Sequence, residues 1–97
     1  MPSMADLADS ILLATDSIPP GRVSTYGDIG RIVGCGPRLV ARVLAGSGGA
    51  ACWWRVVRAD GTIAPGLVAE AAARLAGEGV PTRGGRVDLA TYRAVLE

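Results

Sequence analysis

The stretch Gly34-Cys35-Gly36-Pro37 constrains the fold more than any other part of this sequence. Two glycines interrupt a helical pattern, and proline is favoured at the first position of a helix that follows. Before this break, Thr25 can cap a short helix over residues 26–33. The inward-facing apolar residues of that helix are Ile29, Ile32 and Val33. Because a second short helix begins at Pro37, the pattern predicts a helix-turn-helix.

The helix that begins at Pro37 has one apolar side and one side of arginines and small residues. The apolar side consists of Leu39, Val40, Val43 and Leu44. The opposite side holds Arg38 and Arg42, four residues apart, with Ala41 and Ala45. A major-groove reader normally carries large polar side chains, whereas small residues between arginines suit a narrow minor groove. The alternative is that these small residues only permit tight helix packing.

A further amphipathic helix is predicted at the N-terminus. Ser3 and Asp6 have the spacing of a capping box, and the helix should end before the Ile-Pro-Pro-Gly turn at residues 18–21. Its apolar residues recur at helical spacing and are expected in the core: Met4, Leu7, Ala8, Ile11 and Leu12.

The middle of the chain predicts a short hairpin followed by a helix. Residues 53–57 look extended, and the turn signal at residues 59–61 predicts a hairpin into residues 62–63. The next helix is expected to begin at Pro65 and to end at the glycines near residue 77. Its expected core stripe is Leu67, Val68, Ala71, Ala72 and Leu75.

The end of the chain predicts one more short helix. Residues 80–87 read as a loop or weak hairpin, and Asp88 can cap a helix after them. Its buried residues are expected to be Leu89, Tyr92 and Leu96. With no repeat and no linker, residues 1–97 are predicted to be one domain, mainly α with a short β-hairpin.

Both tryptophans of the chain lie in the segment Cys-Trp-Trp-Arg-Val-Val at residues 52–57. Neighbouring side chains of an extended segment point to opposite faces, so Trp53 and Trp54 cannot share one environment. One indole is expected to anchor the segment and the other to face a cavity. Two core tryptophans with a bend between them are the alternative.

The charge of the chain is concentrated in its middle. The net charge is only +1, yet residues 17–59 hold six arginines against Asp28 alone, which leaves +5 there. A basic region that coincides with the tryptophans is typical of a nucleic-acid surface, although a solvated face is the alternative.

Several missing residue types exclude classes of function. The chain has no His, which removes Ser-His and Cys-His nucleophiles and histidine metal ligands. It also has no Asn or Gln, the usual readers of adenine. Its two cysteines lie in unrelated surroundings, so no metal site and no cofactor are expected. Without an apolar run near ~20 residues or a basic region before the first apolar stretch, no membrane association is expected and a soluble cytoplasmic protein is predicted.

Residues 53–57 resemble the Pro-Cys-His-Arg-Val-Val signature of the O⁶-alkylguanine-DNA alkyltransferases. More closely, they resemble the non-enzymatic alkyltransferase-like proteins, in which tryptophan replaces the reactive cysteine. The similarity also covers residues 18–29, the Gly-Pro-Arg helix start at residues 36–38, and the Glu-Gly-Val and Val-Asp-Leu segments of residues 78–89. It implies the winged helix-turn-helix-like fold of the alkyltransferase C-terminal domain.

The resemblance implies a role for individual side chains. Trp53 takes the position of the alkyl-accepting cysteine and is expected to stack against the alkylated guanine. Tyr26 matches the tyrosine that moves the 3′ phosphate as the nucleotide leaves the duplex, the alternative being a core phenol. Arg42, with Arg38 as the second choice, matches the arginine that fills the vacated position in the duplex.

These roles define two expected sets of residues. Arg55 is expected to hold the segment in place, while the main-chain carbonyls of Trp53 and Val56 face the base. The expected lesion pocket comprises Trp53, Tyr26, Val56, Arg55 and Gly66. The expected DNA contacts are Arg42, Arg38, Thr25, Ala41 and Ala45. The loop at residues 64–66 is short, which predicts a pocket open enough for bulky adducts.

The resemblance therefore implies a monomer that binds double-stranded DNA containing alkylated guanine, transfers no alkyl group and flags the lesion for nucleotide excision repair proteins. One alternative is an active alkyltransferase that uses Cys52, but its thiol needs a cationic neighbour or a helix N-terminus to become a thiolate. The other is a helix-turn-helix transcriptional regulator, against which stand the missing adenine readers and the lack of a dimerisation element.

Overall fold

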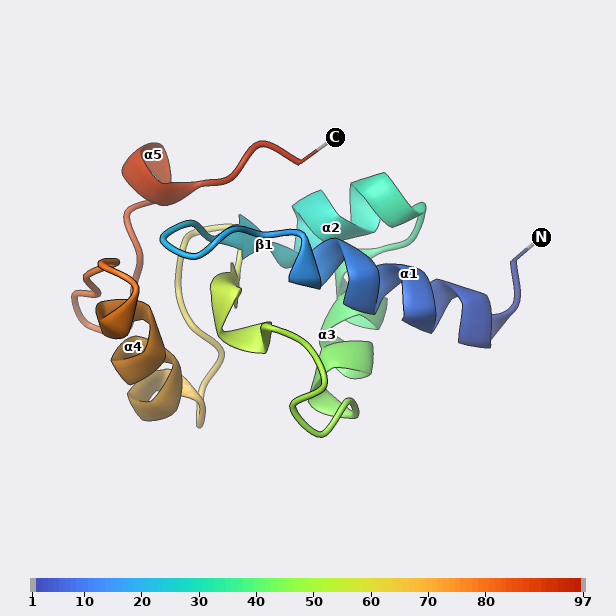
Figure 1. Ribbon diagram of the computed structural model, residues 1–97, viewed down its shortest axis with the longest axis horizontal. Helices are drawn as coiled ribbons and strands as arrows, with labels where there is room; N and C mark the ends of the chain where they lie inside the picture. Colours follow the sequence, from blue (N-terminus) through green and yellow to red (C-terminus); the bar gives the residue numbers. More distant parts are fainter. Residues whose placement is uncertain (1, 97) are drawn as a thin grey trace.

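The computed structural model describes residues 2–96 and is mainly helical, as predicted (Figure 1). The elements in chain order are α1 (Met4–Asp16), β1 (Ser24–Thr25), α2 (Tyr26–Val33), α3 (Pro37–Ala45), the 3₁₀ turn η1 (Trp53–Arg55), β2 (Val56–Val57), α4 (Val68–Gly77) and α5 (Leu89–Tyr92). Helices α1, α2 and α3 gather at one end of the molecule and α4 and α5 at the other, with β1 between them (Figure 1). No helix within residues 2–96 combines the length and apolar character that crossing a bilayer requires.

The helix boundaries follow local signals in the sequence. Ser3 and Asp6 form the expected capping box, and the Thr25 hydroxyl accepts a hydrogen bond from the N–H of Asp28 at the start of α2. Gly34 ends α2 in the left-handed conformation at φ 94°, which favours glycine. Gly30 packs against the carbonyl of Cys35, so a side chain at Gly30 would push α2 and α3 apart. These contacts confirm the predicted helix-turn-helix of α2 and α3.

The two strands do not form the predicted hairpin. β2 pairs with β1 in parallel, with Ser24 opposite Val56 and Thr25 opposite Val57. Residues 53–55, which were expected to be extended, turn because the N–H of Val56 donates to the carbonyl of Trp53. The turn at residues 59–61 does exist, closed by a 2.9 Å hydrogen bond from the Arg58 N–H to the Thr62 carbonyl. Thr62 then bridges to Arg86 instead of pairing with the tryptophan segment.

The strand pair separates two hydrophobic clusters. The first cluster comprises Ile11, Ile18, Ile29, Val40, Leu44, Ala51 and Val56. The second comprises Val23, Val57, Ile63, Ala71, Leu75, Val80 and Val87. Adjacent residues of a strand point to opposite faces, so Val56 enters one cluster and Val57 the other. Both halves of the chain therefore pack against the two-residue strand β2, one on each of its faces.

The predicted start of α4 and part of its core stripe were wrong. The helix begins at Val68 and not at Pro65, because residues 64–67 form a turn in which the Leu67 N–H donates to the Ala64 carbonyl. The later start leaves Leu67 42% exposed and Val68 36% exposed, while Ala71 and Leu75 are buried as expected. Met4 was also expected in the core but is 61% exposed in the first turn of α1.

A buried carboxylate fastens the C-terminal segment to the helix-turn-helix. Asp28, only 8% exposed, accepts hydrogen bonds at 2.9 and 2.8 Å from the guanidinium of Arg93, and Arg31 pairs with it from the same helix. Val23 adds backbone hydrogen bonds to the same segment, at 2.9 Å to the Tyr92 carbonyl and 2.7 Å from the Ala94 N–H. The hydrogen bonds from Arg93 lower the pKa of Asp28 below its ordinary value, against the opposing effect of burial.

Asp28→Asn is expected to lower the free energy of unfolding at pH 7 by about 1–2 kcal/mol, because it removes charge-assisted hydrogen bonds whose arginine partners are partly exposed. A carboxyl with a depressed pKa stabilises the fold above its unfolded pKa of ~3.9 and loses that contribution as pH falls through the lower folded value. Urea denaturation of both proteins should show the difference shrinking towards about pH 3. A difference that stays constant to that pH contradicts this assignment.

Candidate functional site

Trp53 faces a cavity of about 330 Å³ on the side of α3. The lining residues are Tyr26, Ala41, Leu44, Ala45, Gly48, Gly49, Trp53, Ala64 and Leu67. They come from α2, from α3 and the loop after it, from η1 and from the turn before α4. None of these side chains is charged, so the cavity is suited to a flat, largely apolar group.

The two tryptophans have the divided roles that were predicted, although by a different geometry. Their rings meet edge to face, with centroids 6.0 Å apart and planes at 89°. Trp54 anchors the segment: its indole N–H donates to Glu78 at 2.9 Å, and the guanidinium of Arg74 lies 4.6 Å from the centre of its ring. Trp53 is half-buried and lines the cavity. Because η1 is a turn and not a strand, the two rings support each other instead of pointing apart.

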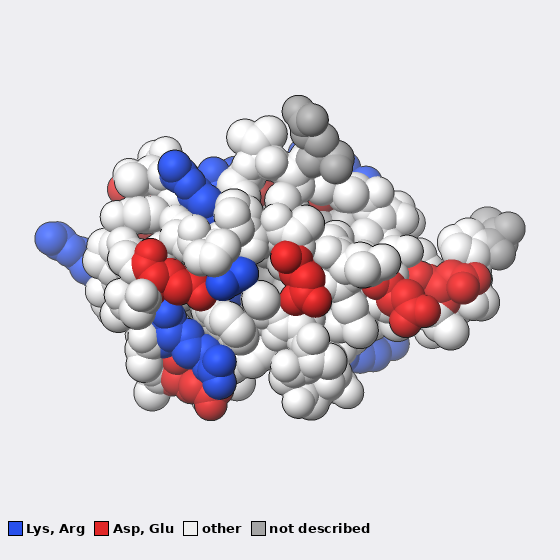
Figure 2. Space-filling model, in the orientation of Figure 1, with Lys and Arg blue, Asp and Glu red and all other residues white. Residues whose placement is uncertain are grey.

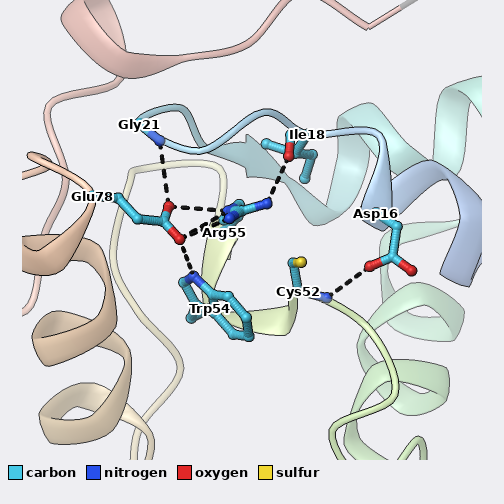
Figure 3. A network of polar contacts seen from close by, with 7 residues as sticks. All are labelled: Asp16, Ile18, Gly21, Cys52, Trp54, Arg55 and Glu78. Atoms are coloured by element: carbon cyan, nitrogen blue, oxygen red, sulfur yellow. Dashed lines mark hydrogen bonds and ion pairs between the residues drawn. The ribbon is translucent and has the colours of Figure 1, made fainter.

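A buried ion pair between Arg55 and Glu78 anchors the tryptophan segment (Figure 3). Arg55 donates to the Glu78 carboxylate through Nε at 3.0 Å and through Nη2 at 2.8 Å, and through Nη1 to the Ile18 carbonyl at 2.9 Å. The same carboxylate accepts from the Gly21 N–H at 3.3 Å and from Trp54. The hydrogen bonds from Arg55 lower the pKa of Glu78, in spite of burial, so the carboxylate is ionised at neutral pH.

Tyr26 is half-buried at the start of α2, where its ring lines the cavity. Burial raises the pKa of its phenol above the ordinary value. The hydroxyl is therefore protonated at neutral pH and available as a hydrogen-bond donor. Tyr26 also packs against the first hydrophobic cluster, as the alternative of a core phenol expects.

The arginines of α3 lie beside the cavity but do not line it. Arg38 precedes Ala41 by three residues and Arg42 precedes Ala45 by three, so each lies one helical turn from a lining alanine. Both are exposed, and neither has a carboxylate partner within residues 2–96. The geometry leaves both available to an external anion.

Some residues of the expected sets lie elsewhere. Arg55, Val56 and Gly66 are not among the lining residues; Arg55 and Val56 are buried, and the Trp53 carbonyl already accepts from the Val56 N–H. Thr25 is 2% exposed and its hydroxyl caps α2, so this side chain is not accessible to a DNA phosphate. The structure brings together Trp53, Tyr26, Ala41 and Ala45 from the predicted residues. It adds five that were not predicted: Leu44, Gly48, Gly49, Ala64 and Leu67.

Neither cysteine has the surroundings of an activated nucleophile. The Cys52 N–H donates to the Asp16 carboxylate at 3.0 Å (Figure 3), and burial raises the pKa of the Cys52 thiol, outweighing the positive charge of Arg55. Cys35 is half-buried in the turn between α2 and α3. Within residues 2–96, no group of His, Cys, Asp or Glu side chains is arranged to hold a metal ion.

Charge is not uniform over the surface. On the face shown in Figure 2, acidic and basic side chains are intermixed, and acidic ones gather over α1. This face therefore does not present the continuous positive surface that a nucleic acid requires.

A separate cavity of about 500 Å³ shares no residue with the Trp53 cavity, and its lining residues are Pro81, Arg83, Arg86, Asp88, Thr91 and Tyr92. The Asp88 carboxylate in this second cavity already accepts hydrogen bonds from the N–H of Ala90 and the hydroxyl of Thr91.

Glu78→Gln is expected to lower the free energy of unfolding by about 3 kcal/mol, because it leaves the buried guanidinium of Arg55 without its counter-charge. The near-ultraviolet circular dichroism of the tryptophan pair should also weaken, since the single acceptor oxygen of an amide cannot serve Trp54, Arg55 and the Gly21 N–H together. Glu70→Gln is the matched control: its pair with Arg74 is exposed and 3.8 Å long, so its effect should stay within about 0.5 kcal/mol. Equal effects of the two substitutions would contradict the anchoring role.

Residues 6–80 match the family model described as 6-O-methylguanine DNA methyltransferase, DNA binding domain. The chain is 41% identical over 87 residues to a "DNA base-flipping protein" of Escherichia coli (strain K12), an alignment that covers 79% of this chain and 65% of that protein. A protein of the same description from Shigella flexneri gives the same values. The chain thus spans 65% of the length of these curated relatives.

Two solved structures share the fold over almost the whole chain. The crystal structure of S. pombe Atl1 in complex with damaged DNA containing O6-carboxymethylguanine superposes with a TM-score of 0.88 at 27% identity. That of S. pombe ATL in complex with DNA superposes with a TM-score of 0.84 at 30% identity. Each comparison covers 97% of this chain and 99% of the other.

Proposed function

This chain belongs to the family of the 6-O-methylguanine DNA methyltransferase DNA-binding domain, as one of its alkyltransferase-like members, and on that premise we propose that it is a sensor of O⁶-alkylguanine in duplex DNA. The extruded base lies against Trp53, and no alkyl group is transferred. The observation that carries this proposal is an indole at the wall of an apolar cavity, beside Tyr26 and the second helix of a helix-turn-helix.

Binding without reaction is energetically reasonable for such a site. Extruding a base costs a few kcal/mol, less when an alkyl group has weakened its pairing. Stacking on an aromatic ring returns ~1–3 kcal/mol per base. These two contributions nearly cancel for an undamaged guanine, so the weaker pairing of the lesion decides which base is held. The edge-to-face contact with Trp54 fixes the ring of Trp53 before DNA arrives, which reduces the ordering cost of binding.

The neighbouring residues have complementary roles in this proposal. Ala41 and Ala45 let α3 approach the minor groove closely. Arg42, or alternatively Arg38, enters the duplex where the base has left. The Tyr26 hydroxyl meets the backbone phosphate. The two thiols stay unreactive, because the chain has no histidine to activate them and burial raises the pKa of Cys52.

The proposal extends to the repair step after recognition. We infer that a cytoplasmic monomer bound to the lesion marks it for nucleotide excision repair proteins. The family resemblance supports this step, which explains how a protein without chemistry contributes to repair.

Binding of labelled duplexes with and without one O⁶-methylguanine, followed by mass spectrometry of the protein, tests the central claim. Wild type should bind the lesion duplex more tightly and gain no mass. Trp53→Ala should lose most of that preference, with a cost of about 1–3 kcal/mol, while keeping its salt-dependent background binding. Trp53→Phe keeps an aromatic face and should retain a preference. A methyl group on Cys52 or Cys35, or no lesion preference in the wild type, would sink the proposal.

The uncharged lining also predicts which adducts are favoured. An O⁶-carboxymethyl group must bury a carboxylate where no lining residue is charged, whereas its carbamoylmethyl amide has nearly the same size and no charge. The amide duplex should bind about tenfold more tightly, corresponding to about 1.4 kcal/mol. Leu67→Arg, at an exposed position of the lining, should remove the difference. Equal wild-type affinities for both duplexes contradict this prediction.

A further inference from the structure

Arg58 lies next to Tyr26 because of the register of the strand pair. β1 and β2 run parallel with Thr25 opposite Val57, so the next residues along the two chains are Tyr26 and Arg58. Neighbouring strands lie about 4.8 Å apart, and parallel strands present their carboxyl ends at one edge. The positive charge of Arg58 acts on the Tyr26 phenol, where it partly offsets the increase in pKa that burial causes. Arg58 and Tyr26 therefore leave the sheet at the same edge, and Tyr26 lines the cavity there.

Hydrogen bonds hold the backbone of Arg58, whereas its side chain makes no ion pair or hydrogen bond within residues 2–96. Its N–H donates to the Thr62 carbonyl at 2.9 Å, and its carbonyl accepts from the Gly61 N–H at 2.8 Å. Within residues 2–96 its guanidinium has no carboxylate partner and no hydrogen bond. The acid nearest in sequence, Asp60, accepts from Thr62 and lies 3.6 Å from Arg86. An exposed guanidinium on a rigid turn can bind an external anion without first breaking an internal ion pair.

We propose that Arg58 and Tyr26 together bind the backbone phosphate of the extruded nucleotide while its base lies against Trp53. This assignment rests on the proposed sensor function. A guanidinium presents several N–H donors in a planar fork that matches phosphate oxygens, and the protonated phenol adds one more donor. Adjacent strand ends supply the two residues, so the hydrogen bonds between β1 and β2 fix the points from which both side chains extend.

This phosphate site differs in its effect from the arginines of α3. In the proposed function, Arg42 or Arg38 fills the position inside the duplex that the base has left, so neither serves the phosphate of the extruded nucleotide. Arg58 follows β2 as Tyr26 follows β1, and in this proposal a phosphate reaches the pair only when its nucleotide has left the stack. Arg58 therefore favours the extruded state and raises the affinity for DNA whose lesion makes extrusion easy.

The test compares Arg58→Ala with Arg83→Ala, a matched control at another exposed arginine without a carboxylate partner within the described chain. Arg58→Ala should weaken binding to the O⁶-methylguanine duplex about tenfold and reduce the salt slope by about one. Its effect on the undamaged duplex should be about twofold or less, since that phosphate stays in the duplex backbone. Arg58→Lys keeps a point charge and should retain part of the affinity, and Arg83→Ala should match the wild type on both duplexes.

A 2-aminopurine placed opposite the lesion reports extrusion separately from binding. At saturating protein, Arg58→Ala should give a smaller fluorescence increase than the wild type, which a merely structural role of Arg58 does not predict when circular dichroism is unchanged. Equal losses on both duplexes, or no loss on either, overturn the phosphate site while leaving the sensor function intact. A wild-type protein without lesion preference overturns the sensor function itself, so the two failures are distinguishable.

Discussion

The geometry of the site depends on one buried ion pair, between Arg55 and Glu78. Burying two charges is costly unless each finds several partners, and here the carboxylate accepts from Arg55, Trp54 and the Gly21 backbone while Arg55 also reaches the Ile18 carbonyl. Glu78 follows α4, and Ile18 and Gly21 precede β1, so three distant segments meet at one group. These contacts fix Trp54, and its edge-to-face contact in turn fixes the ring of Trp53.

The cavity lies at the boundary between the two halves of the molecule. Tyr26 and the residues of α3 belong to the half built on the first hydrophobic cluster, whereas Trp53 packs against the second cluster and Leu67 precedes α4. The strand pair sets how these halves lie against each other, because Val56 and Val57 pack into opposite clusters. A flat apolar group can therefore enter without disturbing either core, since it occupies the junction between them.

The features that the sequence predicted correctly were encoded locally. The capping box at Ser3, the cap at Thr25 and the Gly34 turn act over a few residues, so the helices could be located from pattern alone. The partner of β2 could not, because two-residue strands over 30 positions apart carry no local signal of their pairing. Of the site, Trp53 and Tyr26 followed from the family resemblance, and Ala41 and Ala45 from small residues between arginines. In the sequence, Glu78 stands out only as part of the matching tail, because its role exists only once Arg55 is buried beside it.

The late positions of Leu67 and Glu78 in the chain have a consequence for how the protein is made. A ribosome-bound chain that ends before Leu67 already contains α2 and α3, with every local signal of a helix-turn-helix. It lacks Leu67, the last residue that lines the cavity, and the Glu78 carboxylate, which orients the tryptophans. Fraying of the segment after α4 in the mature protein has the same result, since it releases Glu78. The cavity beside Trp53 is thus complete only in the finished molecule, and an incomplete or partly opened copy lacks it.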